Sequence, residues 1–384
     1  MAANARPLRI QFVTTSLMLG GAEGQVFLLA AEAKRRGHEV SMVTMRDPEA
    51  FEDELRTLGI PLHSLAMRRG VGDPRALVRL ARLVRAERPD VVHSHMVHAN
   101  LLARLTRLLA PMPVQISTAH NLTEGARWRE IAYRLTDPLC DLTTNVCHEC
   151  VERYVASGAA PRGRIRYMAN GLDVARFDPR PGRREAKRRE LGIDPDTFLW
   201  LAVGRLEEQK DYPNMVAAVK HLVEDAGCAR RRLAVLVAGS GDQRSRLEQQ
   251  VEAAGLAATV TFLGDRADVP DLMAAADAYL MSSAWEGMPM VLLEAGAARL
   301  PAVVTDVGGN DEVVSDGASG YVVPPHDSAA LGAAMQRLMS LELPELARFG
   351  AELRRHVETT FGLGAVADRW EALYRELLAR KGRA

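Results

Sequence analysis

The feature that most constrains the fold is a repeated alternation of short runs rich in β-branched residues with longer amphipathic stretches. The first of these runs indicate a strand at 9–13, a helix at 23–36, a strand at 39–43 and a helix at 49–58. Alternation of this kind is typical of strand–helix–strand units that build a parallel sheet covered by helices. The start of the chain therefore predicts a doubly wound α/β domain.

The alternation continues, stops once and then restarts. In the first half we expect further strands at 91–93, 114–117 and 142–146, and helices at 74–87, 97–109 and 127–135. It stops between Asn170 and Asp196, where turn-forming Asn-Gly, Asp-Pro and Pro-Gly pairs surround the charge-dense stretch 183–190, which indicates a turn-rich connection with one short helix. In the second half we expect strands at 198–203, 233–238, 260–263, 278–281 and 302–305. The sequence therefore predicts two parallel sheets joined by a turn-rich segment.

These patterns divide the chain into four parts. We expect a Rossmann-like domain over 1–170, a linker over 171–196, a second Rossmann-like domain over 197–362 and a terminal helix over 363–384. At about 1.5 Å per residue, that helix is long enough to pack back towards the first domain. Open α/β domains bind ligands beyond the carboxyl ends of their strands, so two such domains that face each other would share one cleft.

Composition excludes several classes of protein. With 47% apolar and 26% charged residues, the chain is neither disordered nor collagen-like, and four cysteines are too few for a disulfide scaffold. Few cysteines, no apolar leader and no apolar run of roughly 18 residues predict a cytoplasmic protein that does not span a membrane. The net charge is zero, but residues 1–180 hold 25 Lys and Arg against 19 Asp and Glu, which places any anionic contact on the first half.

In the first domain, glycines and histidines follow the predicted strands. The segment Gly20-Gly21-Ala22-Glu23 lets backbone amides approach an anion at the start of a helix, although a tight turn chosen for packing would use the same residues. It is not a dinucleotide fingerprint, because the third glycine is absent. His95 and His120 also follow strands; we expect His120 in the cleft, and His93, inside its strand, as a packing residue.

In the second domain, cationic residues follow the first strand. Arg205 comes directly after Gly204, and Lys210 stands near the start of the next helix. A guanidinium and an ammonium beside a helix N-terminus suit a diphosphate. The alternative is a surface ion pair of Arg205 with Glu207 or Glu208.

The sharpest feature is a pair of carboxylates, Glu286 and Glu294, with seven residues between them. Pro289 suits the first turn of a helix, which puts Glu286 in the preceding loop and Glu294 inside an apolar helix. An acid in such a segment is costly to bury without hydrogen-bond partners, and a ligand with paired hydroxyls would supply them.

Together, these motifs resemble those of the retaining glycosyltransferases of family 4, which have the GT-B fold of two facing Rossmann-like domains. The resemblance rests on the Gly20–Glu23 segment, Gly204-Arg205 with Lys210, the two carboxylates, and Gly308-Gly309 before Glu312, all in the family's order. It covers nearly the whole chain.

The resemblance implies roles for individual residues. Arg205 and Lys210 would hold the diphosphate of a sugar nucleotide, Glu294 would accept hydrogen bonds from both ribose hydroxyls, and Glu286 would contact the transferred sugar. His120 would lie against the donor sugar, and His95 near the acceptor. Contacts through the backbone or beside the phosphate are implied for Gly20, Gly21, Gly239, Gly264, Arg266, Gly287, Met288, Met290 and Val291.

The predicted function is therefore transfer of a hexosyl or N-acetylhexosaminyl group from a nucleotide-diphosphate sugar, with UDP favoured over GDP. The acceptor would be a glycan or a lipid-linked glycan in surface polysaccharide or glycoconjugate synthesis. We expect no cofactor and no metal, since Asp194-Pro195-Asp196 is turn chemistry and Cys147-x-x-Cys150 lacks further ligands. Three alternatives remain: a sugar-nucleotide epimerase of the same fold, a non-catalytic sugar-nucleotide-binding protein, and a dehydrogenase.

One further pattern concerns location. On the predicted helix at 74–88, Arg75, Arg79 and Arg82 share a face opposite the apolar one. This face is either an ordinary solvated surface or one that approaches an anionic membrane, on whose inner side the protein would be peripheral.

Overall fold

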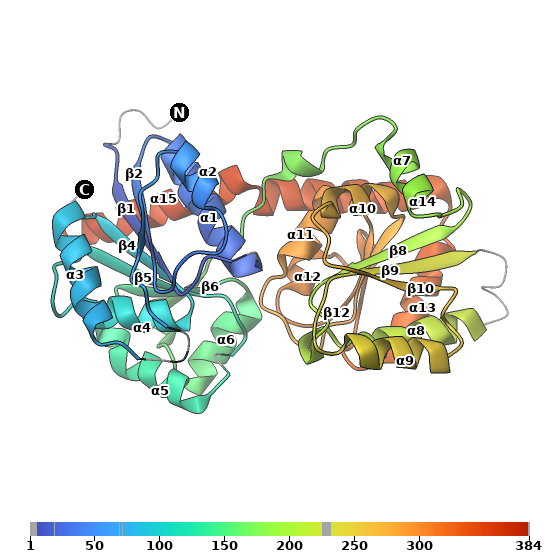
Figure 1. Cartoon of the computed structure of the whole chain (residues 1–384), viewed down its shortest axis with the longest axis horizontal. Helices are drawn as coiled ribbons and strands as arrows, with labels where there is room; N and C mark the ends of the chain where they lie inside the picture. The colour runs from blue at the N-terminus through green and yellow to red at the C-terminus, as the bar shows by residue number, and fades with distance from the viewer. Residues whose placement is uncertain are drawn as a thin grey trace. The chain divides into compact units, whose positions relative to one another are not determined.

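The computed structural model describes residues 6–18, 20–68, 70, 72–123, 125–224 and 232–382. The chain forms two compact units (Figure 1). Unit 1 comprises residues 1–172 and 362–384, and unit 2 comprises residues 173–361.

Unit 1 contains a parallel sheet of seven strands in the order β3-β2-β1-β4-β5-β6-β7. The strands are β1 (Arg9–Thr14), β2 (Glu39–Thr44), β3 (Leu62–Ser64), β4 (Val91–His95), β5 (Val114–Ala119), β6 (Leu142–Asn145) and β7 (Ile165–Tyr167). The sequence analysis missed β3 and β7, because three residues show no readable alternation. The other five lie where the sequence places them, with ends that differ by one or two residues.

Seven helices of the described residues belong to this unit. They are α1 (Gly21–Arg35), α2 (Glu52–Thr57), α3 (Arg75–Glu87), α4 (Val97–Thr106), α5 (Arg127–Thr136), α6 (His148–Ser157) and α15 (Leu363–Arg380). Successive residues of β1 point to opposite faces of the sheet. Ile10 and Phe12 accordingly pack against α1 and α15, whereas Val13 packs with α3 and α4. Helices therefore cover both faces of the sheet.

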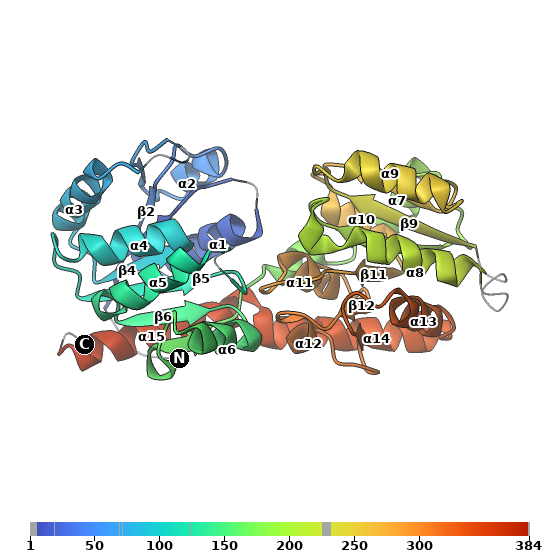
Figure 2. The ribbon, with the colours of Figure 1, turned by 90° about the horizontal axis from the view of Figure 1, so that it is seen from below.

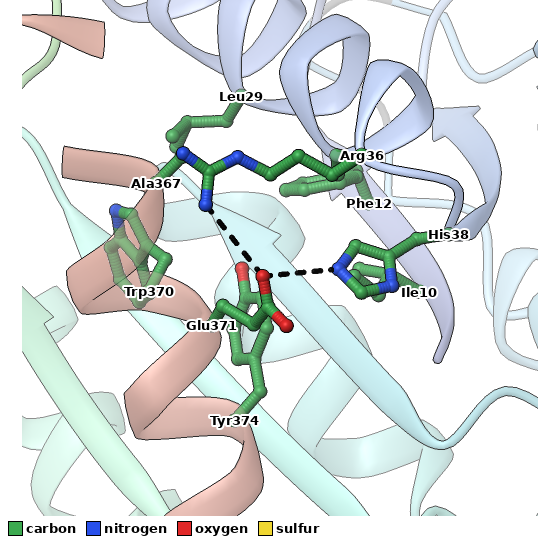
Figure 3. A pocket seen from close by; sticks show the side chains of 10 residues that line it. Ile10, Phe12, Leu29, Arg36, His38, Ala367, Trp370, Glu371 and Tyr374 are labelled. Carbon is green, nitrogen blue, oxygen red and sulfur yellow. Dashed lines mark ion pairs between the residues drawn. The ribbon is translucent and has the colours of Figure 1, made fainter. Parts of the chain in front are cut away.

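The C-terminal helix α15 is an integral part of unit 1. Trp370 and Tyr374 enter the same core as β1 and α1. Beside them, a pocket is bordered by Arg36, His38 and Glu371, whose ion pairs span 3.6 Å and 3.5 Å (Figure 3). The pocket contains none of the site residues predicted from the sequence, so we assign it to the docking of α15.

Unit 2 contains a parallel sheet of six strands in the order β10-β9-β8-β11-β12-β13. They are β8 (Phe198–Val203), β9 (Leu233–Ala238), β10 (Val260–Gly264), β11 (Ala278–Met281), β12 (Ala302–Thr305) and β13 (Gly320–Val323). Its helices are α7 (Arg183–Glu190), α8 (Tyr212–Glu224), α9 (Arg244–Ala253), α10 (Val269–Ala275), α11 (Met290–Ala297), α12 (Asn310–Val313), α13 (Ser328–Met339) and α14 (Leu343–His356). Buried Trp200 lies in the core that α8, α9, α13 and α14 form over this sheet.

The segment predicted as a linker contains the helix α7, which packs within unit 2. Arg184 pairs with Asp277 at 2.5 Å, and Lys187 pairs with Asp268 at 2.7 Å. Arg188 is buried and donates to the carbonyls of Ala275 and Thr197. The short helix expected in this connection is therefore present, and its charged side chains attach it to the rest of unit 2.

The two strand orders determine where ligands can bind. In each sheet the order reverses direction between two neighbouring strands, β1 and β4 in unit 1 and β8 and β11 in unit 2. Loops that leave such a pair diverge to opposite faces and open a crevice at the carboxyl ends. His95 ends β4, while the loops that carry Lys210 and Glu286 follow β8 and β11.

Candidate functional site

The centre of the site in unit 2 is a buried ion pair. Lys210 Nζ donates to Glu286 Oε1 at 2.6 Å, and the Glu286 side chain is only 5% exposed. Ser283 Oγ donates to the same oxygen at 2.7 Å, and Gln209 Nε2 donates to the other at 3.1 Å. Because a buried carboxylate is stable only when it is paired and hydrogen-bonded, these three donors explain how Glu286 is held.

Two of these donors were not identified from the sequence. Gln209 and Ser283 lie beside the predicted residues, one position before Lys210 and three before Glu286. Their polar side chains gave no distinct signal, since such residues are ordinary in loops. Their role depends on the contact between the loops that follow β8 and β11, which the hydrogen bond from Ala284 N to Gln209 O at 2.8 Å also maintains.

Glu294 lies inside α11 and has an unusual environment. Burial raises the pKa of its carboxyl to about 7, and the nearby Arg176 opposes the rise. Among the described residues, no side chain or backbone group hydrogen-bonds to this carboxyl. A half-buried acid without a donor is costly to ionise, so a ligand that offers hydroxyl donors would favour the carboxylate. The helix that the sequence placed around Glu294 is present, but Pro289 precedes its first residue, Met290.

The loop between Glu286 and α11 is pressed against the loop that follows β12. Gly309 N donates to Gly287 O at 2.8 Å. Gly308 has φ +61, and a Cβ there would lie 2.5 Å from Gly287 O, so only glycine fits. This contact holds Gly287, buried Met288 and the first residues of α11, Met290 and Val291, beside Glu286. The first backbone N–H groups of a helix have no partner within it and can donate to an anion.

Glycines also join the loops after β8, β9 and β10. Gly239 N donates to Gly264 O at 2.8 Å. Gly239 has φ +140, and a Cβ on it would lie 2.1 Å from Gly204 O. Gly239 and Gly264 therefore have a structural role in close loop packing, whatever else their backbones contact.

Two predicted cations stand apart from the Lys210–Glu286 pair. Arg205 is 73% exposed and pairs with Glu207 at 2.9 Å, the surface pairing that was its alternative interpretation. Arg266 pairs with Asp268 at 2.6 Å and with Glu190 at 3.3 Å, so acidic neighbours compensate its charge. Asp265 accepts a hydrogen bond from Ser240 at 2.7 Å.

In unit 1, the glycine segment begins α1. Gly20 precedes the helix in an extended conformation, and Gly21 is its first residue. A Cβ on Gly20 would lie 2.7 Å from an oxygen of Glu23, which accepts a hydrogen bond from Ser16 at 2.9 Å. A small shift of the flexible Glu23 side chain would relieve this contact, so local packing alone does not require glycine at Gly20.

Three histidines form a cluster in unit 1. His93 is buried between Tyr374 and Thr118, with hydrogen bonds of 2.7 Å to each. His95 Nδ1 lies 3.1 Å from His120 Nε2. Burial lowers the pKa of His93 and His95 well below the ordinary value and that of His120 to about 4, so all three rings are neutral near pH 7.

The motifs discounted as metal sites have ordinary structural partners. Asp194 pairs with Arg232 at 2.7 Å. Cys147 precedes α6, where its sulfur accepts the N–H of Cys150 at 3.2 Å. Within the ranges that the structure describes, no cluster of three or more His, Cys, Asp or Glu residues could hold a metal ion.

Comparison with known proteins identifies the family. The model of Glycosyltransferase Family 4 matches residues 19–176, and that of the group 1 glycosyl transferases matches residues 183–356. The D-inositol 3-phosphate glycosyltransferase of Saccharomonospora viridis is 31% identical over 312 residues, which are 76% of this chain and 70% of that protein. The chain belongs to glycosyltransferase family 4.

A second relative of this family 4 glycosyltransferase agrees in activity class, and a solved structure agrees in fold. The UDP-Gal:α-D-GlcNAc-diphosphoundecaprenol α-1,3-galactosyltransferase of Escherichia coli is 25% identical over 323 residues, 81% of each chain. Anabaena HepE, solved in complex with UDP, superimposes with a TM-score of 0.85 at 19% identity, over 96% of this chain and 100% of that one. The GT-B fold and the glycosyltransferase class expected from the sequence are confirmed. Among the described residues, no helix has the length and apolar character needed to cross a membrane.

The buried pair gives a stability prediction. Lys210→Met should destabilise unit 2 by about 3–5 kcal/mol, because Glu286 would lose its counter-charge while buried. The matched variant Arg205→Met should cost about 1 kcal/mol or less, because the Arg205–Glu207 pair is exposed. Amide hydrogen exchange in β8 and β11 measures both. Equal losses of protection in the two variants would show that the buried Lys210–Glu286 pair contributes no more to stability than the exposed Arg205–Glu207 pair.

Proposed function

We propose that the chain is a retaining glycosyltransferase that moves a sugar from a UDP-sugar to a glycan or lipid-linked acceptor. The observation that carries the proposal is the loop and helix from Glu286 to Glu294, beyond the carboxyl ends of the strands of unit 2. Glu286 is paired with Lys210, whereas the carboxyl of Glu294 accepts no hydrogen bond from the described residues. The names of similar proteins support a UDP-sugar as the donor. The Escherichia coli enzyme is named for UDP-Gal, and the Anabaena protein was solved with UDP and with UDP-glucose.

Each part of the donor has a proposed partner in unit 2. The Lys210 ammonium group has three N–H donors and uses one of them to bind Glu286. The others can therefore donate to a diphosphate oxygen. The N–H groups of Met290 and Val291 supply further donors, and Arg205 is free to turn from its exposed pair with Glu207. Glu294 accepts from the ribose hydroxyls, and Glu286 from hydroxyls of the sugar. For unit 1, the roles that the resemblance implies stay predictions: Gly21 beside a phosphate or the acceptor, and His120 against a sugar.

These groups suit a front-side substitution. The bond between the anomeric carbon and the diphosphate oxygen breaks, and a bond to the acceptor oxygen forms on the same face. The acceptor's proton passes to an oxygen of the departing phosphate, so no protein base is needed. Charge accumulates on the leaving group in the transition state, and fixed N–H donors aimed at it lower the barrier. We propose that Lys210 and the backbone amides supply this stabilisation without a metal or cofactor.

A donor-hydrolysis and transfer screen tests the proposal. UDP- and GDP-sugars are incubated with the full chain, in excess chelator and without it. We expect release of UDP from one UDP-sugar in both conditions and, with an acceptor, an α-linked product from an α-linked donor, read from the anomeric coupling constant. A GDP-sugar preference, loss of turnover in chelator restored by magnesium, or a β-linked product would each contradict the corresponding part of the proposal.

The same screen separates the alternatives. An epimerase would release nucleotide or convert the donor sugar with no acceptor-dependent product. A binding protein would bind UDP without turnover. The Lys210–Glu286 pair favours the transferase. Gln209, Lys210 and Ser283 all donate to the Glu286 carboxylate, and these hydrogen bonds hold it in the fixed position that catalysis requires.

The structure changes where a membrane contact is proposed. In α3, Arg75 and Arg79 both pair with Asp73, and Arg79 is half-buried, so the predicted arginine face is partly neutralised. The helix α5, in contrast, exposes an apolar stripe. Its side chains Trp128, Ile131 and Leu135 are 57%, 54% and 74% exposed.

The stripe of α5 fits the surface of a bilayer. Spacings of three and four residues put its side chains on one face of the helix. Figure 2 shows α4 beside α5, and Leu108, just beyond α4, is 68% exposed. Exposed Arg127 stands at the start of the helix, and Arg129 lies over the Trp128 ring at 5.3 Å. Tryptophan and arginine together favour an anionic interface, so we propose that α5 lies on the cytoplasmic leaflet where a lipid-linked acceptor resides.

Liposome co-sedimentation measures this contact. We expect binding to vesicles with anionic lipids but not to zwitterionic ones, weakened about tenfold or more in a Trp128→Gln, Ile131→Gln variant, because two exposed apolar side chains no longer enter the interface. The control is Arg75→Glu with Arg82→Glu, which should weaken binding less. A larger loss in the control would place the contact on α3, and absence of any lipid preference would overturn the proposal.

A further inference from the structure

Unit 1 carries a group of cationic side chains that the proposed donor site does not use. They are Arg46, which follows β2, His98 in the first turn of α4, and Arg129 in the first turn of α5. We propose that this group, together with the N-terminus of α4, binds a phosphate or diphosphate group of the acceptor. The inference rests on the proposed function only in giving the anion to the acceptor, since the cationic group itself is a property of unit 1.

The three side chains come from segments at the carboxyl edge of the sheet, where the loop after β1 connects two of them. Arg46 Nη2 donates to Met18 Sδ at 3.6 Å, and Ala99 N, next to His98, donates to Thr15 Oγ1 at 3.3 Å. Met18 and Thr15 both follow β1, so one short segment contacts Arg46 and the start of α4. The strand order of unit 1 reverses between β1 and β4, and a parallel sheet opens a crevice at such a point.

The three cations lie within electrostatic reach of one another. The surrounding protein, which partly excludes water, and the nearby charges of Arg129 and Arg46 lower the pKa of His98 below its ordinary value. Cationic groups that are held close together repel one another, and an anion between them would replace this repulsion by attraction. The arrangement therefore favours a negatively charged ligand.

Among the described residues, no acidic side chain pairs with Arg46 or His98. Two carboxylates, Glu23 and Asp47, lie near the same edge, but each accepts a hydrogen bond from a serine, at 2.9 Å and 2.6 Å. The sulfur that Arg46 contacts is a weak acceptor, and its Nε atom is buried without a partner in the described part of the chain. Arg46 therefore retains the capacity to donate to an anion.

The start of α4 adds backbone donors to these side chains. Val97 and His98 are the first two residues of the helix, and their N–H groups have no partner among the described residues. The N-terminus of a helix also carries a partial positive charge. A phosphate group offers several oxygens that accept hydrogen bonds, so a guanidinium, an imidazole and backbone amides can all donate to it.

The position of the group agrees with the proposed membrane contact. Arg129 belongs to α5, the helix whose exposed stripe is proposed to lie on the leaflet. The phosphate of a lipid-linked acceptor lies at the membrane interface, which is the level at which α5 would present Arg129. One surface of unit 1 would then bind both the lipid and the phosphate.

Histidine NMR locates the anion without an assay of turnover. The full chain is labelled with ¹⁵N-histidine, UDP is added first to occupy the donor site, and inorganic pyrophosphate is then titrated at low ionic strength. We expect the ring signals of His98, assigned with His98→Gln, to shift and its pKa to rise, because a bound anion favours the protonated ring.

His148 is the matched control in the same spectra. It is also an exposed histidine in the first turn of a helix, α6, but it has the acidic Glu152 nearby. We expect little change in its signals. No shift of His98, or equal shifts of His98 and His148, would overturn the inference.

Two arginine variants test the side chains that bind the anion. Arg46→Gln should weaken pyrophosphate binding, measured from the His98 signals, by about tenfold or more, because a charged donor is lost. Arg82→Gln removes an exposed arginine of α3 and should bind pyrophosphate as the wild type does. Equal affinities of Arg46→Gln and the wild type, with both folded by circular dichroism, would contradict the proposed site.

Competition distinguishes a phosphate of the acceptor from a phosphate of the bilayer. Geranyl diphosphate in zwitterionic vesicles offers a diphosphate on a lipid chain, whereas phosphatidylglycerol vesicles offer only anionic headgroups. We expect the first to displace pyrophosphate from the site of His98 and the second not to. Displacement by phosphatidylglycerol alone, or by neither, would overturn the assignment to the acceptor. If no UDP-sugar is turned over, the proposed function fails, while the His98 titration still decides whether the anion site exists.

Discussion

The site in unit 2 depends on the burial of Glu286. A carboxylate that is 5% exposed would be unstable alone, and Lys210, Ser283 and Gln209 together compensate its charge. Those three donors come from two loops that leave neighbouring strands, β8 and β11, at the point where the order of the sheet reverses. One ion pair therefore fixes the distance between the two loops that border the crevice.

Glycines allow the remaining loops to pack closely against this pair. The backbone of Gly308 touches Gly287, and that of Gly239 touches Gly204, at distances that no side chain would permit. The loops are consequently held by backbone contacts. Among the described residues, the N–H groups of Met290 and Val291 and the carboxyl of Glu294 have no hydrogen-bond partner. The surroundings of Glu286 are ordered by hydrogen bonds, whereas the carboxyl of Glu294 is open to accept them, and both properties suit the proposed binding of a nucleotide diphosphate.

The strand-end location of this site could be predicted from the sequence, but its detailed contacts could not. The alternation of strands and helices is periodic, so it predicted both sheets, and Glu294 stood out because an acid in an apolar helix is rare. The ion pair between Lys210 and Glu286 was not foreseen, since it joins residues 76 positions apart. The strands β3 and β7 are too short for periodicity. A short helix was expected at α7, but its attachment to unit 2 was not, because the partners of its charged side chains come together only when the chain has folded.

For the histidines, too, the sequence predicted the positions but not the contacts. Their positions at strand ends were readable, yet the order Tyr374, His93, His95, His120 brings together residues of the C-terminal helix and two strands. The terminal helix was expected to pack towards the first domain, but no local pattern could predict that its Tyr374 would hydrogen-bond to His93.

The central claim is that Glu294 receives the hydroxyls of a nucleotide. The most direct measurement is calorimetry of UDP binding near pH 7 in buffers of different ionisation heat, for the wild type and Glu294→Gln. Because the pKa of the free carboxyl is about 7 and hydroxyl donors favour its ionised form, binding should release about half a proton more from the wild type than from the variant. Weaker UDP binding by Glu294→Gln should accompany that difference. Equal proton release and equal affinity in the two proteins would contradict the account.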